Sequence, residues 1–120
     1  MVYVEISVLA ANALIHLIEK KKIREISYSQ MREYGLKVGE ILDTEYSIPM
    51  LLITDGDALN YLQSYSKFFD VKSFGGEDAK IILKDNFNAE DLKDYFWGGL
   101  RYEIWKAIEK ANEQVLDSVA

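Results

Sequence analysis

Two carboxylates one residue apart form the pattern in this sequence that comes closest to a metal-binding or catalytic motif. Asp55 and Asp57 follow the apolar run Met50–Ile53. Paired carboxylates after a strand can hold Mg²⁺ for phosphoryl transfer or hydrolysis. The same two residues also fit the first turn of a helix that Thr54 begins, where acidic side chains complement the helix dipole. We favour helix capping, and a magnesium-dependent enzyme is the remote alternative.

Other groups that could catalyse a reaction are scarce. The chain has no cysteine, which excludes disulfides, thiol catalysis and zinc-thiolate sites. Its one histidine, His16, lies inside the apolar stretch 6–18, so we expect a hydrogen-bonded core or interface residue. We therefore predict a protein that is not an enzyme, with no catalytic residue, no metal site and no cofactor.

Cationic side chains are concentrated in one segment. Residues 20–37 carry six cations against two carboxylates, whereas residues 38–60 carry five carboxylates and no cation. Such a segment can contact nucleic-acid phosphates, and it can equally be an ordinary solvated surface. The candidate nucleic-acid-binding residues are Lys20, Lys21, Lys22, Arg24, Arg32 and Lys37.

The C-terminal segment carries apolar residues on two flanks of a predicted helix. One flank follows the 3-4-3-4 spacing of a coiled-coil seam. A domain of this size can cover one flank, so the second favours a partner chain; packing of the whole helix onto its own domain is the alternative. The predicted homodimer interface consists of Trp97, Leu100, Ile104, Trp105, Ile108, Ala111 and Val115.

The elements that position these residues are mostly helical. Apolar periodicity and capping residues predict helices over about residues 5–22, 28–43, 55–69 and 89–118, the last interrupted or bent at Gly98-Gly99. Ser27 and Thr54 are the expected N-caps of the second and third helices. Two β-prone runs, 71–74 and 79–84, flank a Gly-Gly turn and predict a hairpin. Residues 2–7 and 23–26 could form short strands, and residues 50–53 could be strand or helix.

This order of elements resembles a winged-helix domain, a helix-turn-helix variant with a β-hairpin wing, over about residues 6–84. The segment 59–72, in which a helix with Leu and Tyr anchors runs into Phe-Phe-Asp-Val and a hairpin, is similar to the third helix and first wing strand of many such domains. The C-terminal helix resembles the dimerising helix of small prokaryotic winged-helix regulators. The connection Thr44–Ile53 is longer than the usual turn, so an unrelated α+β fold is the alternative.

The resemblance implies a mostly helical α+β fold, with a winged-helix-like domain at 1–84 and a helical extension at 85–120. It implies a dimeric nucleic-acid-binding protein, a small transcriptional regulator. The alternative is a non-catalytic interaction module, a subunit or adaptor of a larger assembly. In this family the start of the third helix approaches the major groove and a basic wing tip can enter the minor groove. Here Asp55 and Asp57 stand at the start of the predicted third helix, and Glu77 and Asp78 stand at the predicted wing tip.

Composition limits how such a protein could bind. The 120 residues suit one domain, and the net charge of −6 gives no global attraction to nucleic acid or to an anionic membrane. Any nucleic-acid contact must therefore use the basic edge of the first and second helices, within residues 20–37, and the third helix is a poor candidate. No signal peptide or membrane-spanning stretch is visible, so we expect a cytoplasmic protein without membrane contact. Abundant Lys and Glu with few Gln is a mild sign of a thermophilic source.

Overall fold

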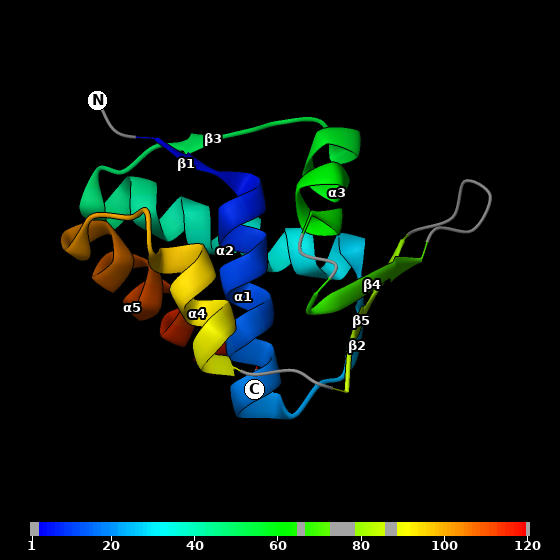
Figure 1. Ribbon diagram of the computed structural model, residues 1–120. Helices are drawn as coiled ribbons and strands as arrows, with labels where there is room; N and C mark the ends of the chain where they lie inside the picture. The colour runs from blue at the N-terminus through cyan, green and yellow to red at the C-terminus, as the bar shows by residue number, and fades with distance from the viewer. Residues whose placement is uncertain (1–2, 65–66, 73–78, 86–88, 120) are drawn as a thin grey trace.

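The centre of the fold is α1 (Ile6–Lys21), an almost entirely buried helix around which the other helices pack (Figure 1). This computed structural model describes residues 3–64, 67–72, 79–85 and 89–119; of Lys21, Asp55, Ala89, Tyr95, Phe96 and residues 116–119 it describes the backbone alone. The helix α1 contacts α2 (Tyr28–Tyr46), α3 (Asp55–Gln63), α4 (Ala89–Trp97) and α5 (Tyr102–Val119). The predicted mostly helical α+β class is confirmed.

Two apolar cores meet at α1. The first lies between α1, α2, α3 and a small sheet, and it includes Leu14, Met31, Leu62, Phe69 and Ile81. The second lies between α1, α2 and α5, and it includes Ile6, Leu9, Val38, Leu42 and Ile108. Because α1 faces both cores, nearly every one of its positions must be apolar, which explains its unbroken hydrophobic sequence.

Helix starts follow the predicted capping residues. The Ser27 hydroxyl accepts a hydrogen bond from the backbone N–H of Gln30 at 3.3 Å, and the Thr54 hydroxyl accepts one from the N–H of Asp57 at 3.1 Å. Both caps satisfy backbone donors that have no partner inside the helix. The second helix runs three residues further than expected, to Tyr46, and its C-cap is Ser47, whose φ is 54°. Local signals therefore fix the starts better than the ends.

The predicted hairpin and edge strand form one antiparallel sheet. Its strands β2 (Glu25–Ser27), β4 (Phe69–Lys72) and β5 (Lys80–Leu83) lie in the order β2-β5-β4. Ile26, Phe69, Ile81 and Leu83 point into the core, while Asp70, Lys72 and Lys80 are exposed, as period-two alternation requires. The Gly-Gly turn and the acidic residues at its tip lie outside the described residues.

A second, parallel pair of strands uses the long connection between α2 and α3. The strand β3 (Met50–Leu51) pairs with β1 (Val4–Glu5), and the N–H of Val4 donates to the carbonyl of Pro49 at 3.1 Å. The sequence left residues 50–53 open between strand and helix. In the structure Met50 and Leu51 form a strand, and the helix that follows them begins at Asp55. The extra length of this connection joins the N-terminus to the middle of the chain.

Two predicted helices differ from the structure at their ends. The third helix ends at Gln63 instead of Phe69, because Phe68 and Phe69 are needed in the first core and Phe69 pairs with Leu83 in the sheet. The C-terminal segment is interrupted and forms two helices, α4 and α5. It resumes at Tyr102, so Leu100 lies in the connection and the proposed seam is not continuous.

The C-terminal helices pack into the same cores as the rest of the chain. Leu92 of α4 is fully buried in the first core, and Ile108 of α5 is fully buried in the second. The predicted boundary between residues 84 and 85 falls between β5 and α4, and each apolar core contains residues from both sides of it. Among the described residues, no helix combines the length and apolarity needed to cross a bilayer.

Candidate nucleic-acid interface

The first part of the predicted basic segment lies at the end of α1. Lys20 is exposed in the last turn, Lys22 is the left-handed C-cap with φ 56°, and Arg24 is exposed just before β2. Cations at this place complement the free carbonyls of the helix end. Lys21 lies in the same turn, and its side chain is outside the described residues.

The second part of that segment lies elsewhere. Arg32 is half-buried on α2, and Lys37 is exposed on α2 and forms an ion pair with Glu33 at 3.7 Å. Five helical positions separate the two residues, so they point about 140° apart around the helix. The six predicted cations therefore do not form one surface.

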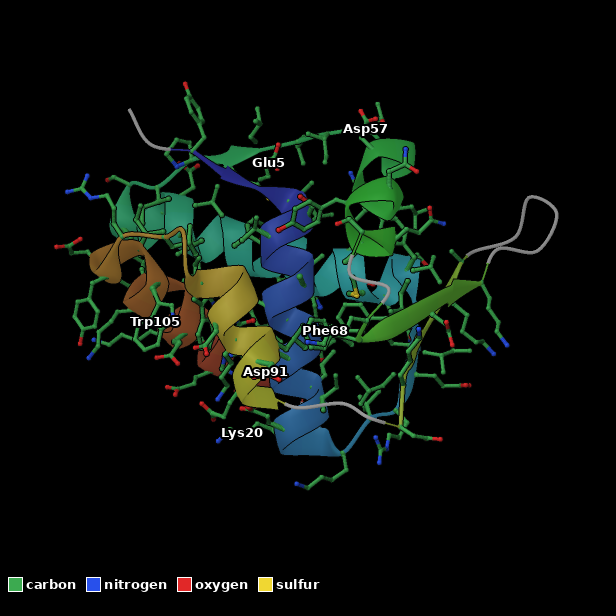
Figure 2. All side chains as sticks on the ribbon, in the orientation of Figure 1. Glu5, Lys20, Asp57, Phe68, Asp91 and Trp105 are labelled. Carbon is green, nitrogen blue, oxygen red and sulfur yellow. The ribbon has the colours of Figure 1, made fainter. Side chains whose placement is uncertain are left out.

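The Lys72–Lys80 pair and the end of α1 lie at opposite ends of the sheet. The carbonyl of Arg24 accepts from the N–H of Leu83 at 2.9 Å, whereas Ser27, at the other end of β2, pairs with Lys80. The hairpin tip follows Lys72 and precedes Lys80. Figure 2 shows Lys20 near the lower end of α1 and Asp57 at the far end of α3, which sits above β4 in Figure 1. A ligand on the α3 and hairpin side would not reach the end of α1 through the same contact.

The exposed face of α3 is polar in a way that the sequence analysis missed. Asp57, Asn60 and Ser64 are exposed at spacings of three and four, and Gln63 is exposed beside them. The opposite face is anchored by Ala58 and Leu62, which are buried. The sequence could have indicated this face, because its polar residues recur at helical spacing opposite an apolar face. Asn and Gln side chains have the donor and acceptor geometry that recognises adenine in the major groove.

Several lysines lie on the sheet and on the connection that follows α3. Lys72 and Lys80 pair directly across β4 and β5, so both side chains lie on the outer surface of the sheet. Lys80 forms an ion pair with Glu25 at 3.5 Å, and Lys84 forms one with Asp70 at 3.8 Å. Lys67, at the end of the α3–β4 connection, lies 5.6 Å from the centre of the Phe68 ring. No ion pair holds Lys67 or Lys72 within the described part of the chain, which leaves both available for phosphate contacts.

Most of the predicted dimer interface is covered by the chain itself. Four of its seven residues pack in the core with α1 and α2, and they are Ile104, Ile108, Ala111 and Val115. The alternative, packing onto the same domain, thus holds for this flank. Trp97, Leu100 and Trp105 are only half-buried, so of the seven predicted residues these three could still contact a second copy of the chain.

These three residues line a groove between α4 and α5. It has a volume of about 730 Å³, and its other lining residues include Tyr102 and the carboxylates Glu90, Asp94 and Glu109. The Trp97 and Trp105 rings meet edge to face at 5.0 Å, and Tyr102 stacks on Trp105 at 5.7 Å. Figure 2 shows Trp105 on the side of the molecule away from the hairpin. This groove is separate from the α3 face.

His16 is a buried residue, as predicted, with 7% of its surface exposed. Its Nδ1 is buried and accepts no hydrogen bond from the described residues. Burial lowers the pKa of the imidazole, and Lys93 and Lys20 act in the same direction, while Glu19 and Glu113 oppose them. The lowered pKa therefore favours the neutral imidazole at neutral pH.

Metal-binding geometry is not found in the part of the chain that the structure describes. No group of three or more His, Asp or Glu side chains there could hold an ion. Thr54 caps α3 as expected by accepting from the N–H of Asp57, and the side chain of Asp55 lies outside the described residues. The chain matches no family model, no curated protein and no solved structure.

Proposed function

We propose that this protein is a winged-helix nucleic-acid-binding protein, a small cytoplasmic transcriptional regulator. The observation that carries the proposal is the pairing of β2 with the β4–β5 hairpin in the order β2-β5-β4, with three helices α1, α2 and α3 packed on it. The winged-helix resemblance implies this arrangement. It consists of a helix, a strand, two helices, and a hairpin whose second strand pairs with the strand that follows the first helix.

The surface proposed for nucleic acid is the exposed face of α3 together with Lys67 of the α3–β4 connection and Lys72 at the turn end of β4. Asn60 and Gln63 would read base edges, and Lys67 and Lys72 would contact phosphates. Asp57 lies on the same face and repels phosphates. Lys20, Lys22 and Arg24 lie at or near the opposite end of the sheet from Lys72 and Lys80, so they are not part of this proposed surface.

Selection of duplexes from a random pool tests this proposal. The wild-type protein is expected to enrich a sequence preference, and the double variant Asn60→Ala, Gln63→Ala to lose it, because each lost bidentate contact removes about 1–3 kcal/mol of discrimination. The matched control is Gln114→Ala, which removes an exposed amide from α5. No enrichment by the wild type, or equal loss in the control, contradicts a sequence-specific regulator.

A second candidate function is that of a non-catalytic protein-interaction module. The observation that favours it is the half-buried aromatic groove at α4 and α5, on the side away from the hairpin. Absence of DNA binding at low salt, with capture of a protein partner through Trp97 and Trp105, would favour this function over the first.

A further inference from the structure

The groove between α4 and α5 combines aromatic rings with an excess of negative charge. Trp97, Tyr102 and Trp105 supply the rings, and three carboxylates face one lysine, Lys93, along the lining. Lys93 is already engaged, since its Nζ lies 2.8 Å from a carboxylate oxygen of Glu19. The lining of the groove therefore combines aromatic rings with more carboxylates than cations.

The chain's own lysines show how these rings interact with cations. The Nζ of Lys93 lies 5.8 Å from the Trp97 ring centre, and the Nζ of Lys106 lies 5.3 Å from that of Tyr102. Both distances are within the range of cation–π attraction. Tyr102 is 64% exposed, so its ring can be reached from solvent.

The carboxylates are distributed along the groove. Glu90 and Asp94 lie one turn apart on α4, and Glu109 lies across the groove on α5. Burial raises the pKa of Glu109, and Glu113 and Glu19 add to that effect, whereas Lys93 and Lys106 oppose it. A cation brought close to Glu109 would relieve this penalty. Several separated carboxylates suit several cations on one chain better than a single ammonium ion.

From this charge complementarity we propose that the groove binds a basic segment of a partner protein, whose Lys or Arg side chains pair with Asp94 and Glu109 and take the place of Lys106 at the exposed ring of Tyr102. The volume of about 730 Å³ accommodates a few side chains. This surface is independent of the α3 face, so it can be occupied whether or not the protein binds nucleic acid.

Intrinsic fluorescence reports on the groove directly, because Trp97 and Trp105 are the two tryptophans of the whole chain. The probe is a hexa-arginine peptide at physiological salt, with hexa-glutamate as the negative probe. Hexa-arginine is expected to change the fluorescence saturably. The variants Asp94→Asn and Tyr102→Ala are each expected to weaken binding about two- to fivefold.

Matched variants separate this site from the general acidity of the protein. Glu40→Gln removes an exposed carboxylate from α2, and Tyr102→Phe keeps the ring; both are expected to bind like the wild type. Equal weakening by Glu40→Gln and Asp94→Asn, or unchanged binding by Tyr102→Ala, overturns the proposal. Tetramethylammonium binding as tightly as the peptide would also overturn it, in favour of a small-ammonium site. A dimer in sedimentation that dissociates on Tyr102→Ala would assign the groove to a second copy of the chain.

Discussion

At the scale of single residues, His16 couples the stability of the fold to pH. It is enclosed on α1, and Glu19 and Lys20 of α1, Lys93 of α4 and Glu113 of α5 act on it electrostatically. Because burial lowers its pKa in the folded state, the unfolded chain binds a proton that the folded chain does not, at pH values between the lowered pKa and about 6.5. Stability must therefore rise with pH across that interval.

We predict that acidification from neutral pH to just below about 6.5 lowers the free energy of unfolding, and that His16→Gln removes this dependence. Urea unfolding of both proteins over this range measures the difference. The raised pKa of Glu109 acts in the opposite direction, since a folded state that binds protons more tightly gains stability on acidification. It is present in both proteins and cancels from their difference. Parallel pH curves for the wild type and the variant would contradict the prediction.

Asp57 is the residue on α3 whose charge opposes the proposed function. Its N–H is held by Thr54, while its exposed carboxylate lies on the face proposed for nucleic acid. We predict that Asp55→Asn with Asp57→Asn tightens DNA binding, by roughly two- to fivefold per charge. Anisotropy titration of a labelled duplex measures it, with Asp43→Asn on α2 as the control. An unchanged affinity removes the start of α3 from the interface.

At the scale of elements, the packing of α1 against α2 depends on a small residue. A Cβ atom added to Gly35 would lie 2.9 Å from the backbone nitrogen of Ala10 and 3.1 Å from its Cα. The obstacle is backbone, so the two helices would have to separate. At Gly56 of α3, by contrast, the nearest atom to an added Cβ is the Thr54 hydroxyl oxygen at 4.0 Å.

We predict that Gly35→Ala destabilises the protein by about 1–3 kcal/mol, despite the better helix propensity of alanine. Gly56→Ala is the matched control, and it is expected to be neutral or stabilising by up to about 1 kcal/mol. Urea unfolding compares the two variants. Equal stability of Gly35→Ala and the wild type would show that the α1–α2 contact tolerates an added methyl group.

Elements with local signals could be predicted, and elements with distant partners could not. The caps at Ser27 and Thr54 act within three residues, so the sequence reveals the starts of α2 and α3. The pairing of Val4 with Met50 joins residues far apart through two-residue strands, which no periodicity indicates. An apolar helix face likewise shows that something covers it without showing what. The sequence therefore could not divide the apolar residues of α5 between α1 and α2, which cover Ile104 and Ile108, and a partner chain.

At the scale of the whole molecule, the net charge of −6 conceals two distinct surfaces. The side with α3 and the hairpin carries exposed amides on α3 and the exposed Lys67 and Lys72, and the groove of α4 and α5 carries an excess of carboxylates. Sequence position alone grouped Lys20 with Lys37, but the turn into β2 and the rotation along α2 place them on different surfaces. The residues of the candidate site are therefore grouped by the fold and not by their positions in the sequence.

Binding of the wild-type protein to duplex DNA across a salt series tests the central claim most directly. Contacts by Lys67 and Lys72 predict a slope of log affinity against log salt of about −2. The double variant Lys67→Ala, Lys72→Ala is expected to flatten the slope by about 2, whereas Lys110→Ala on α5 leaves it unchanged. No binding at low salt, or the wild-type slope in the double variant, would contradict nucleic-acid recognition through the α3 and hairpin face.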